Sequence, residues 1–224
     1  MTYPTFPNDG GFKKSLQEST APFIAILRGL PLEQAESIAI TLIETGFRYI
    51  EVPLNTPHAL EAIHIIQDVA NTASEEIAVG AGTVLKASQV DLVHETGGTL
   101  IISPNMNPSV IQRTKALGMI SIPGVYTVTE AFDAIESGAD ALKFFPAESV
   151  SPEIAKAMLT VLPKEVAYLA VGGIKPDTQQ LLAYYDAGIN GFGIGGGLYK
   201  PEYTLAQIHQ NAQNFMKAHQ GVSL

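Results

Sequence analysis

The sequence predicts a single α/β domain, a TIM barrel built from eight strand–helix units. Short apolar runs alternate with amphipathic stretches, and there are eight such runs at similar intervals along the chain. No linker, charge run or low-complexity segment interrupts the chain between residues 20 and 220. A doubly wound open sheet is the alternative, but eight even units favour a closed (β/α)8 barrel.

The predicted strands are short, mostly continuous and rich in β-branched or aromatic residues. This composition is typical of parallel strands that are covered on both faces. The predicted strands are 23–27, 49–53, 77–80, 100–102, 119–122, 141–145, 167–171 and 191–194.

Helix signals occupy the intervals between these strands. Residues 32–45 carry apolar side chains at helical spacing, and Gly46 follows as a glycine that ends the helix. Thr127 and Glu130 have the spacing of a capping box, and Ser151 precedes a proline at the first helical position. Similar closing glycines follow the other predicted helices, at 97, 118, 138 and 188.

Composition narrows the classes of function. The chain has 224 residues, no cysteine and a formal net charge of −9. The missing cysteines exclude disulfides, thiolate metal sites and cysteine nucleophiles, and the acidic balance argues against nucleic-acid or anionic-membrane binding. We expect a leader over residues 1–20, without the features of a secretory signal, and a barrel domain over 21–224 in a cytoplasmic protein.

Lys143 is the most informative single residue, because it lies among apolar neighbours inside a predicted strand. A lysine directed into a barrel is desolvated, which lowers its pKa and makes it a nucleophile for an imine with a ketone. The alternative is a lysine whose stem packs while its amine reaches solvent.

Glu51 is the matching carboxylate, in the middle of the second predicted strand. A buried carboxylate is costly unless it is paired or used. Across the barrel from Lys143, it could supply the general acid and base that imine chemistry needs; a structural ion pair is the alternative.

Glycine-rich loops after the seventh and eighth strands predict an anion site. This is where TIM barrels usually bind phosphate, through backbone N–H groups and helix N-termini. Tight turns that need positive φ angles are the alternative. The glycines concerned are Gly172, Gly173, Gly195 and Gly196.

Few other charged groups are expected at the carboxyl ends of the strands. Of the three arginines, Arg28 alone is predicted to lie there, because Arg48 begins the second strand and Arg113 lies on a helix. None of the five histidines has metal-ligand spacing at a strand end, so we expect no metal and no organic cofactor.

Eight short motifs follow one another along the chain. They are Ile-Leu-Arg-Gly (26–29), Glu-Val-Pro-Leu-Asn-Thr (51–56), Gly-Ala-Gly-Thr-Val (80–84), Ser-Pro-Asn (103–105), Ile-Pro-Gly (122–124), Leu-Lys-Phe-Phe-Pro (142–146), Val-Gly-Gly-Ile (171–174) and Gly-Ile-Gly-Gly (193–196). With these motifs in this order, the chain resembles the 2-keto-3-deoxy-6-phosphogluconate/-phosphogalactonate aldolase family from residue 21 to near its C-terminus.

The resemblance implies a homotrimeric TIM-barrel class I aldolase that releases pyruvate and glyceraldehyde 3-phosphate. It implies that Lys143 forms the Schiff base and that Glu51 is the acid/base. The other positions that it places at a phosphorylated keto-acid substrate are Arg28, Gly82, Thr83, Pro104, Phe145 and the four glycines of the phosphate loops.

The second of these motifs, residues 51–56, differs between two branches of the family. Phosphogluconate enzymes usually have Glu-Val-Thr-Leu-Arg-Thr, with an arginine that assists the phosphate, whereas this chain has Pro53 and Asn55. The resemblance is to the phosphogalactonate branch. The C4 epimer 2-dehydro-3-deoxy-6-phosphogluconate and 4-hydroxy-2-oxoglutarate remain alternative substrates. A sugar-phosphate epimerase or isomerase, and a non-catalytic sugar-phosphate binding barrel, are the alternatives of other classes.

Overall fold

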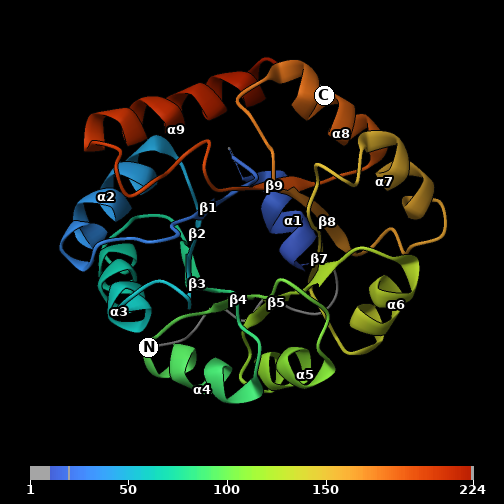
Figure 1. Ribbon diagram of the computed structural model, residues 1–224, viewed down its shortest axis with the longest axis horizontal. Helices are drawn as coiled ribbons and strands as arrows, with labels where there is room; N and C mark the ends of the chain where they lie inside the picture. The colour runs from blue at the N-terminus through green and yellow to red at the C-terminus, as the bar shows by residue number, and fades with distance from the viewer. Residues whose placement is uncertain (1–10, 20, 223–224) are drawn as a thin grey trace.

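A computed structural model describes residues 11–19 and 21–222 as a ring of parallel strands surrounded by helices (Figure 1). The strand order is β5-β4-β3-β2-β1-β9-β8-β7-β6. Because β5 and β6 are separated only by Pro123, they form one side of the ring, which pairs with β4 at one edge and β7 at the other. The nine strands therefore close as eight barrel strands, which confirms the predicted fold.

The strands agree closely with the predicted ones. They are β1 (Phe23–Ile26), β2 (Tyr49–Pro53), β3 (Ala78–Gly82), β4 (Leu100–Ile102), β5 (Ile120–Ile122), β6 (Gly124–Val125), β7 (Ala141–Phe144), β8 (Ala167–Val171) and β9 (Gly191–Ile194).

Helices lie outside the ring, except the first. They are α1 (Gly11–Glu18), the 3-10 turn η1 (Leu32–Gln34), α2 (Ala35–Thr45), α3 (Ala59–Ala70), α4 (Ala87–Glu95), α5 (Pro108–Ala116), α6 (Val128–Glu136), α7 (Pro152–Leu159), α8 (Thr178–Ala187) and α9 (Leu205–Gln220). Within the part of the chain that the structure describes, none of these helices combines the length and apolarity needed to cross a membrane.

The predicted helix ends are largely confirmed. Gly46 ends α2 at φ +108°, a conformation that glycine adopts without a steric penalty. Thr127 and Glu130 form the capping box of α6, and the Ser151 hydroxyl accepts a hydrogen bond from an N–H in the first turn of α7. Lys86 precedes the first turn of α4.

Side chains of alternate residues along each strand point to opposite faces of the barrel wall. Phe23, Ile50 and Phe192 belong to the larger core, between the strands and the outer helices. A second cluster fills the barrel interior, where Ile102, Ile122 and Leu169 pack against one another. Polar groups in that interior lie on the same alternate positions as these apolar residues.

The helix α1 closes the amino end of the barrel, as its position within the ring in Figure 1 illustrates. Its residues Phe12 and Leu16 are buried in the interior cluster. The ring of Phe12 meets that of Tyr49 edge-on, with centroids 5.4 Å apart, and Ser15 Oγ lies 2.7 Å from the Tyr49 hydroxyl oxygen. Residues 11–18 of the expected leader are thus packed into the barrel; residues 1–10 and 20 lie outside the described residues.

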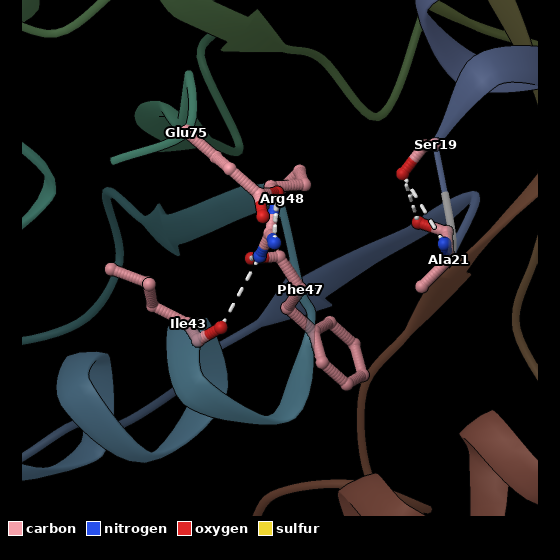
Figure 2. A network of polar contacts seen from close by, with 6 residues as sticks. All are labelled: Ser19, Ala21, Ile43, Phe47, Arg48 and Glu75. Carbon is pink, nitrogen blue, oxygen red and sulfur yellow. Dashed lines mark hydrogen bonds and ion pairs between the residues drawn. The ribbon is translucent and has the colours of Figure 1, made fainter. Parts of the chain in front are cut away.

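Arg48 anchors the amino end of β2, as predicted, away from the carboxyl ends of the strands. Figure 2 shows its guanidinium paired with Glu75 and donating hydrogen bonds to the carbonyl oxygens of Ile43 and Phe47, at 3.2 and 3.1 Å. Nearby, the Ser19 hydroxyl donates a 3.0 Å hydrogen bond to the carbonyl oxygen of Ala21, close to the start of β1.

Candidate active site

Two oppositely charged side chains face each other inside the barrel. Glu51 lies on β2 and Lys143 on β7, and these strands are four places apart in a ring of eight. Both side chains line one narrow cavity, although the residues are only 3% and 7% exposed. The remaining walls of the cavity are Ile24, Ile26, Ile102, Ile122, Leu169, Val171 and Gly193.

This apolar lining changes the proton affinity of both groups. Burial raises the pKa of Glu51 to about 7, although the charges of Lys143 and Arg28 act in the opposite direction. Burial lowers the pKa of Lys143; the charge of Glu51 opposes this effect and the charge of Arg28 adds to it. Burial thus favours the uncharged form of each group, a neutral amine and a neutral carboxyl, and these are the forms that attack a ketone and donate a proton in imine chemistry.

Gly82, the last residue of β3, provides the space that the carboxylate of Glu51 occupies. A Cβ atom at Gly82 would lie only 1.4 Å from Oε2 of Glu51. Among the described residues, this buried oxygen has no hydrogen-bond partner. An unpaired carboxylate oxygen in an apolar cavity is costly in a purely structural role, so its retention favours a chemical one.

Phe145 lies directly beside the amine of Lys143. Its ring centroid is 4.9 Å from Nζ, a cation–π distance. The two residues are two positions apart, so their side chains share one face of the chain. The ring remains 38% exposed, at the open end of the barrel.

Arg28 lies just beyond β1 and reaches the same end of the barrel. Its Nη1 donates a 2.8 Å hydrogen bond to Oδ1 of Asn55, in the loop after β2. The next residue, Thr56, accepts a 2.9 Å hydrogen bond from the N–H of Gly29. Two neighbouring loops are thereby held together beside the Lys143–Glu51 pair.

Thr83 and Pro104 occupy the loops after β3 and β4, as expected. Thr83 has a φ of +56°, a left-handed conformation that is unfavourable for a β-branched residue. The Pro104 carbonyl packs so closely on Gly124 that a Cβ there would lie 2.4 Å from the carbonyl oxygen. Both loops are consequently fixed by backbone geometry.

The glycine loops after β8 and β9 come together at this end too. Gly172 and Gly173 both have positive φ, of +105° and +66°. The side chain of Glu148 lies against them, where a Cβ on Gly173 would be 2.5 Å from its Cγ. Around Gly196 there is more space, and the nearest atom to a Cβ there is Cε of Lys200, at 3.8 Å.

Four residues at this end were not predicted as site residues. Asn55 and Thr56 belong to the second motif, Glu148 lies two residues after Leu-Lys-Phe-Phe-Pro, and Lys200 lies three residues after the last glycine run. Their positions in or near the motifs could have suggested a role at the site. Contacts between side chains of different loops follow no regular spacing in the sequence, so the contacts themselves could not be predicted.

No group of three metal-ligating side chains was found among residues 11–19 and 21–222. The titratable side chains that line the cavity inside the barrel are Lys143 and Glu51. A parallel barrel that holds a desolvated lysine opposite a carboxyl group defines a class I, Schiff-base aldolase.

Comparison with known proteins identifies the family. The sequence profile of the KDPG and KHG aldolases matches residues 15–207. The chain is 41% identical over 201 residues to the probable 2-dehydro-3-deoxy-6-phosphogalactonate aldolase of Rhizobium meliloti, covering 90% of this chain and 92% of the relative. It is 40% identical over 202 residues to the 2-dehydro-3-deoxy-6-phosphogalactonate aldolase of Escherichia coli, covering 90% and 96%.

A solved structure agrees with these relatives. The native KDPGal structure superposes with a TM-score of 0.86 at 40% identity, covering 91% of this chain and 97% of that one. The chain belongs to the KDPG and KHG aldolase family, and it is an aldolase, a carbon–carbon lyase.

Proposed function

We propose that this aldolase cleaves 2-dehydro-3-deoxy-6-phospho-D-galactonate to pyruvate and D-glyceraldehyde 3-phosphate. The observation that carries the proposal is the buried Lys143–Glu51 pair facing across one cavity. The choice of epimer is supported by the relatives, both of which act on phosphogalactonate by name, and by Pro53 and Asn55 in the second motif.

Lys143 is the nucleophile of this mechanism. Its neutral amine attacks the C2 carbonyl and forms a C2–N bond, and loss of water gives a protonated imine. The C3–C4 bond then breaks, and its electron pair moves to the imine to form an enamine. After C3 takes up a proton, water adds to C2 and releases pyruvate and the free amine.

Glu51 moves the protons. As an acid it assists the departure of water from C2, and as a base it accepts the proton of the C4 hydroxyl while C3–C4 breaks. A pKa of about 7 suits both directions at neutral pH. The imine is the electron sink, so the reaction needs no metal and no organic cofactor.

The substrate's two anionic ends are held by different elements. Gly172, Gly173, Gly195 and Gly196 offer backbone N–H groups to the phosphate. The other contacts that we assign to substrate come from Arg28, Gly82, Thr83, Pro104 and Phe145.

Borohydride reduction in the presence of pyruvate tests the nucleophile. We expect a stable adduct on Lys143, located by peptide mass mapping. Lys143→Ala abolishes both adduct and turnover, whereas Lys156→Ala, the same change at an exposed lysine of α7, leaves both intact. Trapping on another lysine, or none at all, refutes the mechanism.

Glu51→Gln tests the acid/base role. We expect turnover to fall by about 10²–10⁴, the usual contribution of general acid–base catalysis. A lactate dehydrogenase-coupled assay detects released pyruvate, which also distinguishes an aldolase from a sugar-phosphate binding barrel. Unchanged turnover after EDTA, together with trapping, argues against a metal-dependent epimerase or isomerase.

The substrate itself is decided by kcat/KM for the two C4 epimers and for 4-hydroxy-2-oxoglutarate. We expect the phosphogalactonate epimer to be preferred. Equal or better cleavage of the phosphogluconate epimer contradicts this assignment.

We also infer a cytoplasmic homotrimer. We assign its contacts to exposed apolar side chains on or just before α4 and α6, the helices on either side of α5. They are Leu85, Leu92, Tyr126 and Phe132. Light scattering should give three times the 23.8 kDa of one chain.

A further inference from the structure

The side chain of Asn55, in the loop after β2, contacts the guanidinium of Arg28. Its Oδ1 accepts the 2.8 Å hydrogen bond from Nη1 of Arg28, and the adjacent Thr56 binds the backbone N–H of Gly29. Consecutive residues of the β2 loop therefore hold both the guanidinium of Arg28 and the backbone next to it. This arrangement fixes a long side chain that is otherwise exposed.

The charge of Arg28 is exerted at the reacting centre. Taken by itself, this charge lowers the pKa of both Glu51 and Lys143; for Glu51 the opposite effect of burial is larger. The glycine loops, by contrast, have backbone N–H groups and the stem of Lys200 beside Gly196. A substrate carboxylate bonded directly to C2 must lie close to Lys143 when the imine forms, whereas the phosphate lies at the far end of the substrate.

An asparagine can orient Arg28 without neutralising its charge. Its carboxamide oxygen accepts a hydrogen bond and carries no charge. An aspartate would form an ion pair with the guanidinium, and an arginine has no acceptor and would repel it. Asn55, where phosphogluconate enzymes usually have an arginine, can therefore hold Arg28 in place, which an arginine could not do.

We propose that Asn55 is a positioning residue that holds the guanidinium of Arg28 toward the substrate carboxylate next to the imine carbon. Asn55 does not touch the reacting atoms and acts only through Arg28. The proposal rests on the proposed keto-acid substrate and assigns the group that Arg28 recognises.

Pyruvate is the probe, because it has the carboxylate and ketone but no phosphate. In borohydride trapping, we expect Asn55→Leu to raise the half-saturating pyruvate concentration roughly three- to tenfold, the range for the net contribution of one ordinary hydrogen bond. The maximal trapping rate should change less than about twofold, a split that a general loss of structure would not produce. Asn71→Leu removes an amide oxygen that accepts from Gln67 on α3 and should behave as wild type.

A double-mutant cycle tests whether Asn55 acts through Arg28. In an Arg28→Met background, Asn55→Leu should have no further effect on half-saturation. Asn55→Asp should weaken pyruvate binding and move the acid limb of the pH–rate profile to higher pH, because a new negative charge favours the protonated forms of the pair.

The outcomes separate the two proposals. A raised KM for the phosphorylated substrate with unchanged pyruvate half-saturation, or full additivity in the cycle, overturns the role of Asn55. Absence of any wild-type trapping overturns the Schiff-base mechanism instead. In that case a saturation-transfer NMR titration of pyruvate without borohydride, on the same variants, still decides the role of Asn55.

Discussion

The ring of Phe145 lies 4.9 Å from the amine of Lys143, measured from ring centroid to Nζ. Its face stabilises a cation at that nitrogen, by about 0.5–2 kcal/mol depending on desolvation. In the proposed mechanism the protonated imine is a cation at the same nitrogen, so the contact would stabilise that intermediate too. Burial opposes the charge of Lys143 and lowers its pKa.

Phe145→Leu keeps an apolar side chain but removes the aromatic face. We expect kcat/KM to fall by about three- to thirtyfold, from the loss of cation–π stabilisation of the imine. Thermal stability should barely change, because the ring is partly exposed. Phe145→Tyr retains the ring and serves as the control; an equal loss of activity in both variants contradicts the interpretation.

Gly82→Ala should inactivate the enzyme without unfolding it. The new methyl group would meet Oε2 of Glu51 at 1.4 Å, and the end of that side chain can move away. We expect at least a hundredfold loss of kcat, as for removal of a general acid–base, with the Tm nearly unchanged.

Gly80→Ala is the matched comparison on the same strand. Its methyl group would lie 1.8 Å from the backbone carbonyl oxygen of Leu100, which cannot rotate away. We expect loss of folded protein, measured by circular dichroism and soluble yield. The interpretation of both sites is wrong if Gly82→Ala unfolds while Gly80→Ala remains folded.

Glu51 should make the stability of the protein depend on pH. Its pKa of about 7 in the folded state lies above the ordinary 4.5, so folding favours the protonated form. The stabilisation of the fold by the protonated Glu51 carboxyl group is fully present below pH 4.5 and is lost as the pH rises through 7. When the pH is raised from 5 to 8, the free energy of unfolding of the wild type should fall by about 2–3 kcal/mol relative to that of Glu51→Gln, because one unit of pKa shift corresponds to 1.36 kcal/mol.

Urea unfolding at both pH values measures this difference. Glu36→Gln makes the same chemical change on an exposed position of α2 and controls for net charge. A wild type that gains stability relative to Glu51→Gln on raising the pH contradicts the assigned direction.

Removal of the Phe12 ring should weaken the fold and spare the chemistry. The side chain is 2% exposed in the barrel interior and contacts Tyr49, so Phe12→Ala should cost about 3–5 kcal/mol in the free energy of unfolding. Since α1 lies at the amino end of the barrel, kcat per folded molecule should be unchanged.

Denaturant titration and the pyruvate assay measure these two effects separately. Ile154→Ala, at a half-exposed side chain of α7, is the control and should lose much less stability. A large loss of kcat in Phe12→Ala at full occupancy of the folded state would mean that the two ends of the barrel are coupled.

The sequence by itself determined the barrel and the two buried charged residues that face each other inside it. Local patterns suffice for both, because strand residues alternate in direction and each strand carries its own apolar signal. Once eight strands are counted, β2 and β7 must lie opposite each other, which places Glu51 and Lys143 across the interior. The helix caps at Gly46 and Thr127 are likewise local features.

The tertiary structure alone decided which loops and side chains meet. The bond from Arg28 to Asn55, the fit of Glu51 over Gly82 and the packing of α1 beneath Tyr49 join residues from separate units. Such contacts depend on the register and closure of the whole barrel, which no spacing within one segment encodes. The polar leader composition also concealed α1, because two buried side chains, Phe12 and Leu16, are enough to hold a short helix inside a barrel end.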